Sequence, residues 1–232
     1  PWLFSLIDPQ RALATDDIFI TADKLLLYPM PVTQRLRYEV QSHVAKTHRS
    51  SLRLSHHEQR FYTALPPQSN PQAVQLGRTW QRNGLSTQQT IDTALRLFHQ
   101  EFSYTLQPPA LGEHSVDEFL FSTKRGFCEH FSSALVVLLR AAGIPSRVVV
   151  GYQGGQWNSV ENYTLVRQSN AHAWVEAWTD EGWILVDPTA AVAPNRIEQG
   201  INHALDAQDQ ALVSRFWQRS KTLSALQMYM DA

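Results

Sequence analysis

The chain has 232 residues but only one cysteine, Cys128, which excludes an internal disulfide. It also has no excess of charge, because 20 basic and 21 acidic residues leave a formal net charge of −1. Without a basic surplus, we expect no nucleic-acid partner. The longest aliphatic run, 134–139, is far shorter than the ~20 residues that a membrane span needs. We therefore expect no membrane span within this sequence.

Recognisable metal and phosphate motifs are also missing. Cys128, His130 and His172 have neither a second cysteine nor a paired helical histidine beside them, which argues against zinc. Gly154-Gly155 lacks the strand-to-helix setting of a phosphate loop. The sequence also has no acidic loop of the kind that binds calcium. We predict no metal and no other bound cofactor.

What is present is typical of a folded globular protein, since 43% of residues are hydrophobic and 18% are charged. The sequence begins at Pro1 without a methionine, so we expect a fragment or a processed product, and we find no signal peptide. The length allows one large domain or two small ones.

The first 65 residues are predicted to be β-rich. Residues 35–44 alternate in a period of two and are predicted to form a strand, and 17–28 is expected to be its partner, interrupted at 21–24. His56-His57 is predicted to be a solvated turn. The proline-containing segment 66–71 is the best domain boundary, because proline disrupts both helix and strand.

Helical periodicity begins after that boundary. Ser86 and Gln89 form a predicted capping box, and Gly143 is expected to end a helix that starts at Cys128. The predicted helices are 73–81, 86–98 and 128–142, and the predicted strands are 147–152, 163–167, 171–179 and 183–187. The resulting division is a β-rich region at 1–65, a core at 72–200 and a helical segment at 201–232.

Cys128 stands where a helix begins, and there the backbone N–H groups and the helix dipole favour a thiolate. A cysteine nucleophile also needs an imidazole and an acceptor that orients it. His172 begins one predicted strand and Asp187 ends the next, so a helix against an antiparallel sheet would bring the three together. Taken one by one, each is more often structural; together they predict a thiol enzyme.

Alternation places His172, Trp174, Glu176 and Trp178 on one strand face. Trp174 could belong to the core or exclude water from the site, and Glu176 could support the histidine or be an exposed carboxylate. Tyr104 could line the site or donate to an oxyanion, although packing is the commoner role. Tyr104, Trp174 and Glu176 are therefore candidate site-lining residues.

Four segments, in order, resemble the transglutaminase-like superfamily: Gly126–Phe131, Leu139–Tyr152, His172–Glu176 and Gly182–Thr189. The resemblance extends from about Phe98 to Ala193. It implies an α+β, papain-like fold in which a catalytic helix packs on an antiparallel sheet, here preceded by a small β-rich region. It also implies a triad of Cys128, His172 and Asp187.

The activity that this resemblance implies is acyl transfer from a protein glutamine side chain to a primary amine through a cysteine thioester. No organic cofactor is then needed, because the sulfur carries the acyl group. The same triad could instead perform hydrolysis as a protease, peptidase or deamidase. An alternative of another class is a non-catalytic module that binds peptides or envelope components. The arrangement is most similar to bacterial membrane-anchored members, which implies the periplasmic domain of an inner-membrane protein.

Overall fold

The computed structural model describes residues 1–13, 17–43, 47–48 and 53–195. It divides into two compact units. The first contains Pro1–Arg53 together with Asp180–Ile184, and the second begins at Leu54 and contains the rest of the described chain. Within those described ranges, no helix is both long and apolar enough to cross a membrane. The predicted segment 201–232 lies outside the described residues.

The first unit is built from short antiparallel strands. These are β1 (Trp2–Leu3), β2 (Pro9–Ala12), β3 (Phe19–Ile20), β4 (Leu26–Leu27), β5 (Val40–Ser42) and β6 (Thr47–His48). Strands β1, β4 and β3 form one sheet, β2 pairs with β5, and β6 pairs with Trp183 and Ile184. The predicted strand at 17–28 forms β3 and β4, separated by a turn in which Lys24 N–H donates to Thr21 O. Its predicted role as partner of the strand over 35–44 was wrong, because β3 and β4 pair with each other and β5 pairs with β2.

The prediction of one strand over 35–44 was wrong in extent, because the strand covers only 40–42 of its described residues. Alternation alone does not supply a partner strand. The Tyr38 hydroxyl instead donates to Phe4 O at 2.7 Å and accepts from Phe4 N at 2.9 Å. A side chain thus takes up backbone groups that a strand ladder would otherwise pair.

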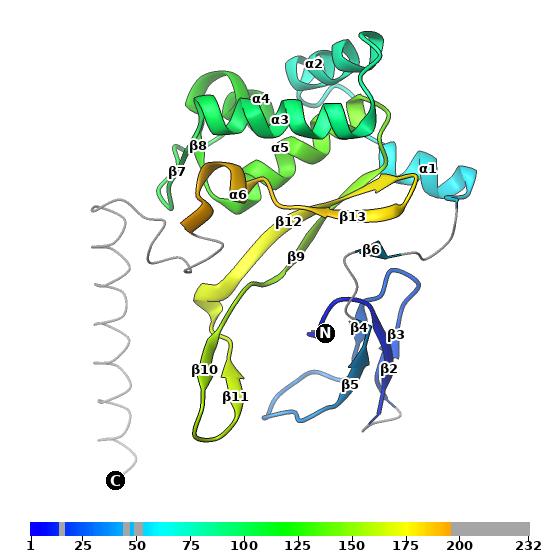
Figure 1. Ribbon diagram of the computed structural model, residues 1–232, viewed down its shortest axis with the longest axis vertical. Helices are drawn as coiled ribbons and strands as arrows, with labels where there is room; N and C mark the ends of the chain where they lie inside the picture. The colour runs from blue at the N-terminus through cyan, green and yellow to red at the C-terminus, as the bar shows by residue number, and fades with distance from the viewer. Residues whose placement is uncertain (14–16, 44–46, 49–52, 196–232) are drawn as a thin grey trace. The chain divides into compact units, whose positions relative to one another are not determined.

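The second unit places helices over an antiparallel sheet. Its helices are α1 (His56–Thr63), α2 (Pro71–Arg82), α3 (Thr87–Glu101), α4 (Ser115–Glu118), α5 (Cys128–Ala141) and α6 (Thr189–Val192), with a π-helical turn at Phe119–Thr123 and a 3₁₀ turn at Gln168–Asn170. Its strands are β7 (Ser103–Tyr104), β8 (Arg125–Gly126), β9 (Ser146–Tyr152), β10 (Gln156–Asn158), β11 (Tyr163–Leu165), β12 (Ala171–Thr179) and the last two residues of β13 (Gly182–Val186), whose first three residues belong to the first unit. Strands β9, β12 and β13 are neighbours in one sheet, and α2, α3 and α5 lie on one side of β9 and β12 (Figure 1).

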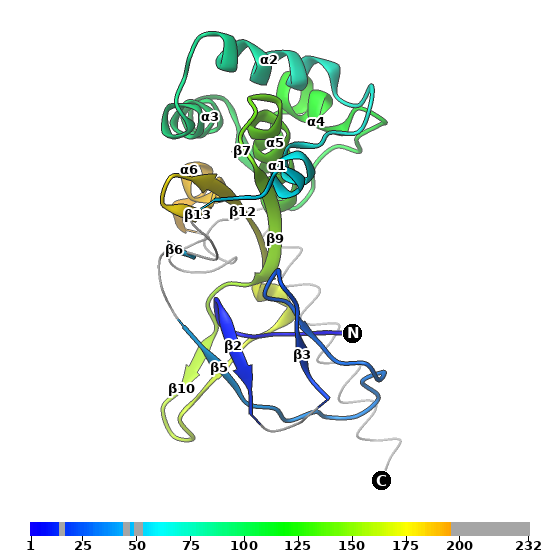
Figure 2. The ribbon, with the colours of Figure 1, turned by 90° about the vertical axis from the view of Figure 1, so that its right-hand side faces the viewer.

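Helix α5 is the centre of this unit and lies between α2 and the strands β9 and β12 (Figure 2). It is buried around most of its circumference because it is covered from both sides, as an apolar helix requires. Near its start, the rings of Phe98, Phe102, Phe119 and Phe131 pack together with centroids 5.1 to 6.1 Å apart. The helix that begins at Cys128 therefore has a rigid setting.

Two helix boundaries illustrate what local signals can and cannot predict. The capping box of Ser86 and Gln89 is confirmed at the start of α3, and Gly143 follows α5 with φ +81°, as a helix stop requires. The reading of His56-His57 as a turn was wrong, since both residues belong to α1. The missed signal was a second capping box, Ser55 with Glu58.

Replacing Gly77 by alanine is expected to destabilise the packing of α2 on α5. An added Cβ would lie 2.5 Å from Leu138 O and 2.6 Å from Ala141 Cβ, and the first of these atoms is backbone that cannot rotate away. Overpacking of this kind costs about 2 kcal/mol. In a chain of this length, that corresponds to a fall of about 4–8 °C in the thermal unfolding midpoint, measurable by circular dichroism.

Gly84 provides the matched control for that substitution. It has φ +73°, but nothing lies within 4 Å of its added Cβ, so Gly84→Ala introduces backbone strain of about 1 kcal/mol without a collision. A midpoint for Gly77→Ala equal to or above that of Gly84→Ala would contradict the close approach of the two helices.

Candidate active site

Cys128 is the first residue of α5, and its side chain is buried. The chain enters α5 through β8, whose Gly126 pairs with Tyr104 of β7 in a parallel bridge. A Cβ at Gly126 would lie 2.7 Å from both Cβ and Cγ of His130, so only glycine fits there. The close approach at Gly126 and the β7–β8 pairing together define where the cysteine lies.

His130 lies close to Cys128 in sequence but is used locally. Its Nδ1 accepts the Phe127 N–H at 3.4 Å, and its ring packs against Phe127 and Phe119. Burial lowers its pKa, against the raising effects of Glu129 and of the Phe127 backbone. His130 is therefore largely neutral near pH 7 and supports the start of the helix.

His172 and Asp187 are joined directly. His172 is the second residue of β12, opposite Gly151 of β9, and Asp187 follows the last residue of β13. His172 Nε2 lies 2.7 Å from Asp187 Oδ2, and Asp187 Oδ1 accepts the Thr189 N–H at 2.9 Å. The carboxylate is thus oriented by the backbone that follows it, and it in turn orients the imidazole.

The other nitrogen of His172 is available to Cys128. Nδ1 is buried and makes no hydrogen bond of regular geometry within the described residues. Cys128 nevertheless acts on the imidazole both as a hydrogen-bonding partner and through its charge. Since Asp187 occupies Nε2, we assign the cysteine to Nδ1, in a contact looser than a regular hydrogen bond, as is common in sites without substrate.

These surroundings set the charge of His172. Burial, the largest effect, lowers its pKa, but the hydrogen bonds and charges of Asp187 and Cys128 together outweigh it and raise the pKa to about 9. The imidazole is therefore protonated at neutral pH. A buried cation next to a thiol and a carboxylate is the arrangement that a cysteine acyl-transfer site needs.

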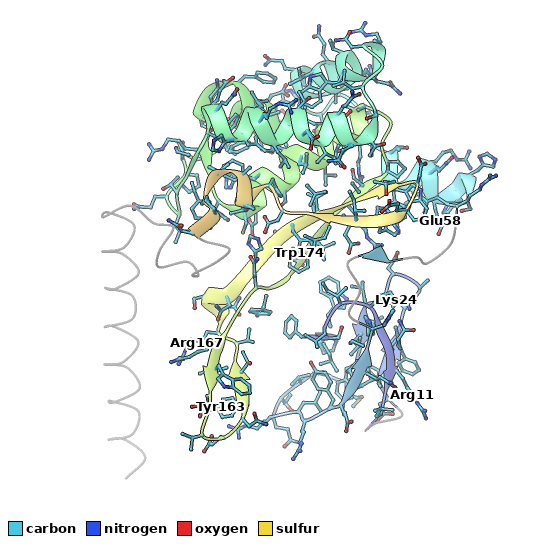
Figure 3. The ribbon with its side chains drawn as sticks, viewed as in Figure 1. Arg11, Lys24, Glu58, Tyr163, Arg167 and Trp174 are labelled. Carbon is cyan, nitrogen blue, oxygen red and sulfur yellow. The ribbon has the colours of Figure 1, made fainter. Side chains whose placement is uncertain are left out.

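The three candidate site-lining residues lie in different surroundings. The Trp174 ring stacks near His172, with centroids 6.2 Å apart and an interplanar angle of 30°, and its Cη2 would lie 2.9 Å from a Cβ at Gly151. Figure 3 marks Trp174 on β12, and Tyr163 on the separate β10–β11 hairpin. Tyr104 lies in β7, next to the strand that leads to Cys128.

Glu176 lies two residues after Trp174 on β12 and contacts other elements. Its carboxylate pairs with the Arg147 guanidinium at 2.8 Å, and Arg147 also donates to the Tyr62 hydroxyl of α1 at 3.3 Å. The structure therefore brings Cys128, His172 and Asp187 together with Trp174 beside them, whereas Glu176 joins β12 to β9 and α1.

Two residues near the site were not singled out from the sequence. Ser132 Oγ donates to Ala173 O at 3.0 Å, and the Thr189 N–H binds Asp187. Ser132 is one of few polar residues in an apolar helix, four positions after Cys128, and this was a usable signal. Thr189 gave none, since its contact depends on the turn after Asp187.

No group of three or more metal-ligating side chains occurs in the part of the chain that the structure describes.

Comparison with known proteins decides the family. The family model of the transglutaminase-like superfamily matches residues 75–188. The crystal structure of the periplasmic domain of TgpA from Pseudomonas aeruginosa bound to ethylmercury superposes with a TM-score of 0.79 at 43% identity, covering 86% of this chain and 71% of that one. This chain belongs to the transglutaminase-like superfamily. The predicted α+β, transglutaminase-like fold is thereby confirmed.

Two curated relatives extend the comparison. The protein-glutamine gamma-glutamyltransferase of P. aeruginosa is 44% identical over 214 residues, which are 91% of this chain and 31% of that protein. The uncharacterized protein YebA of Bacillus subtilis is 48% identical over 86 residues, or 35% of this chain and 12% of that one. The chain thus spans about a third or less of the length of these two relatives.

Proposed function

We propose that this chain is a transglutaminase in which Cys128, His172 and Asp187 act as the catalytic triad. The Cys128 thiolate attacks the side-chain carbonyl carbon of a protein glutamine and forms a tetrahedral oxyanion. The Cys128 backbone N–H at the start of α5 supplies one donor to that oxyanion. Collapse breaks the carbon–nitrogen bond, His172 gives its proton to the departing nitrogen, and ammonia leaves a thioester on Cys128.

The second half of the reaction reverses these roles. A primary amine attacks the thioester carbonyl while neutral His172 accepts the amine proton. The second tetrahedral intermediate expels the sulfur, leaving a substituted amide and restoring the thiolate–imidazolium pair. Asp187 orients the imidazole in both halves. Because the sulfur itself carries the acyl group, the reaction needs no organic cofactor.

The observation that carries this proposal is the contact of His172 Nε2 with Asp187 Oδ2 at 2.7 Å, with Cys128, at the start of α5, acting on the same imidazole. The name of the P. aeruginosa relative supports transfer in preference to hydrolysis. Transfer and hydrolysis share the first half-reaction and differ in whether an amine or water accepts the acyl group. We assign to Trp174, beside His172, the role of excluding water, and to Tyr104 that of lining the approach to Cys128.

Location and organisation are part of the same proposal. The likeness to a periplasmic domain supports a periplasmic location, and we propose that the full-length protein is anchored in the bacterial inner membrane. Its partners would be a protein or peptide glutamine donor and a primary-amine acceptor. We also propose that 72–200 is the catalytic core, with 1–65 and 201–232 as flanking regions.

Mass spectrometry of a peptide with a single glutamine tests the activity. Incubation with the chain and butylamine is expected to give the butylamide of the peptide, with ammonia release that increases when amine is added. Protein alkylated beforehand with iodoacetamide is the control and should give no product. Deamidated peptide alone, even at high amine concentration, would identify a hydrolase, and unchanged peptide would favour a binding module.

A further inference from the structure

One hydrogen bond directly connects the helix that carries the cysteine with the strand that carries the histidine. Ser132 is one helical turn after Cys128 on the same face of α5, and its side chain is fully buried. Its hydroxyl donates to the carbonyl of Ala173, the residue that follows His172. The donor of this bond thus lies one helical turn from Cys128, and its acceptor lies one residue from His172.

The direction of the bond is unusual for a serine within a helix. Such a hydroxyl commonly bonds back to the carbonyl four residues earlier, here that of Cys128. Ser132 instead donates across the interface to β12. A buried hydroxyl without a partner is costly, so this bond favours one position of α5 relative to the strand.

The rest of this interface has little directional preference. On β12, Ala173, Val175 and Ala177 alternate as buried apolar residues, and the buried residues of α5 are mainly aliphatic. Apolar contacts are roughly proportional to buried area and tolerate small displacements. A hydrogen bond depends strongly on distance and angle. Further along α5, the Arg140 guanidinium donates to Ser146 O of β9 at 3.0 and 2.8 Å, so Ser132 is the one of these directional contacts that lies next to Cys128 and His172.

We propose that Ser132 is a positioning residue, which holds the Cys128 sulfur against His172 Nδ1 through its bond to Ala173. The role matters because the contact between Nδ1 and the sulfur is looser than a regular hydrogen bond and depends on where the two backbones lie. This inference rests on the proposed function for its catalytic meaning, whereas its effect on thiol reactivity can be measured without any acyl transfer.

Ser146 offers a matched control. It is also a fully buried serine, and its hydroxyl lies 3.5 Å from Val136 O, so it too joins α5 to the sheet through a backbone carbonyl. Val136 lies two turns beyond Cys128, and Ser146 is at the far end of β9 from Gly151, which pairs with His172. A purely structural role for buried serines predicts similar effects of Ser132→Ala and Ser146→Ala.

The experiment compares wild type, Ser132→Ala and Ser146→Ala in three measurements: the thermal midpoint, the rate of Cys128 alkylation by iodoacetamide from pH 5 to 10, and kcat and KM for amine incorporation. Small misplacements of reacting groups can lower rates by about 100-fold. For Ser132→Ala we expect kcat to fall about 10- to 100-fold with KM within about twofold. For Ser132→Ala, the ratio of the alkylation rate at pH 6 to the rate at pH 9 should be about tenfold lower than for wild type. Ser146→Ala should keep the wild-type ratio.

Two outcomes would overturn the proposal. One is an alkylation profile for Ser132→Ala that matches wild type or Ser146→Ala. The other is loss of reactivity in Ser132→Ala only in proportion to unfolded protein. If wild type alkylates readily at pH 6 but transfers no acyl group, the proposed function fails, and the alkylation comparison still decides the role of Ser132.

Discussion

The Cys128→Ala variant is expected to lose amine incorporation by at least about 10⁴-fold, because removal of a nucleophile leaves only binding and oxyanion stabilisation. No other cysteine exists in the chain to replace it. The side chain is small, so its removal should leave the fold intact, with a thermal midpoint within about 5 °C of wild type. Incorporation of a fluorescent amine into a glutamine peptide measures the loss.

The same variant also tests whether the sulfur interacts with His172. Cys128 contributes to the raised pKa of that histidine both as a hydrogen-bonding partner and as a charge. Its replacement by alanine should therefore lower the His172 pKa below about 9, as followed by NMR of the imidazole. Cys128→Ser is the control for shape. A histidine pKa unchanged in Cys128→Ala, or amine incorporation that persists there, would mean that the two groups do not work together.

Asp187→Ala is expected to lower kcat by about 10³- to 10⁴-fold, as loss of the orienting carboxylate does in hydrolytic triads. Asp187 accounts for the largest of the effects that raise the His172 pKa. Without this carboxylate, burial lowers the pKa of the histidine with less opposition. The pKa should therefore fall further than in Cys128→Ala. Stopped-time assays of amine incorporation give kcat, and NMR gives the histidine pKa.

The raised pKa of His172 also makes stability and kcat depend on pH. Wild-type His172 has a pKa of about 9 in the folded chain against 6.5 for the ordinary group. Protonated His172 thus stabilises the folded state fully below pH 6.5, and this contribution is lost as pH rises through about 9. Wild-type kcat should likewise fall as pH rises through about 9, because the leaving nitrogen needs that proton.

Asp187→Asn separates charge from placement. Its side-chain oxygen can still accept the Thr189 N–H, so the turn into α6 is kept while the negative charge is lost. The alkaline decline in kcat should move to lower pH, and the thermal midpoint should no longer fall between pH 6.5 and 9. If Asp187→Asn shows the wild-type profile, the carboxylate charge does not control His172.

Local sequence signals predicted several elements of the second unit well. The capping box at Ser86, the glycine at position 143 and the alternation at 171–179 each depend on residues close together in the chain, and each matches the structure. The prediction of a strand over 35–44 failed for the opposite reason. Its alternation was real, but a strand also needs a partner along its whole length, and β2 pairs only with 40–42.

The sequence by itself determined the order and spacing of Cys128, His172 and Asp187, the helix that begins at the cysteine, and the resemblance to the transglutaminase-like superfamily. Only the tertiary structure decided which polar groups meet. Ser132 and Ala173 are 41 positions apart, and Glu176 finds Arg147 at a distance of 29 positions. The charge of His172 is also a tertiary property, because burial and the fields of Asp187 and Cys128 set it jointly. Such contacts depend on distances between elements, and no local pattern of residues encodes them.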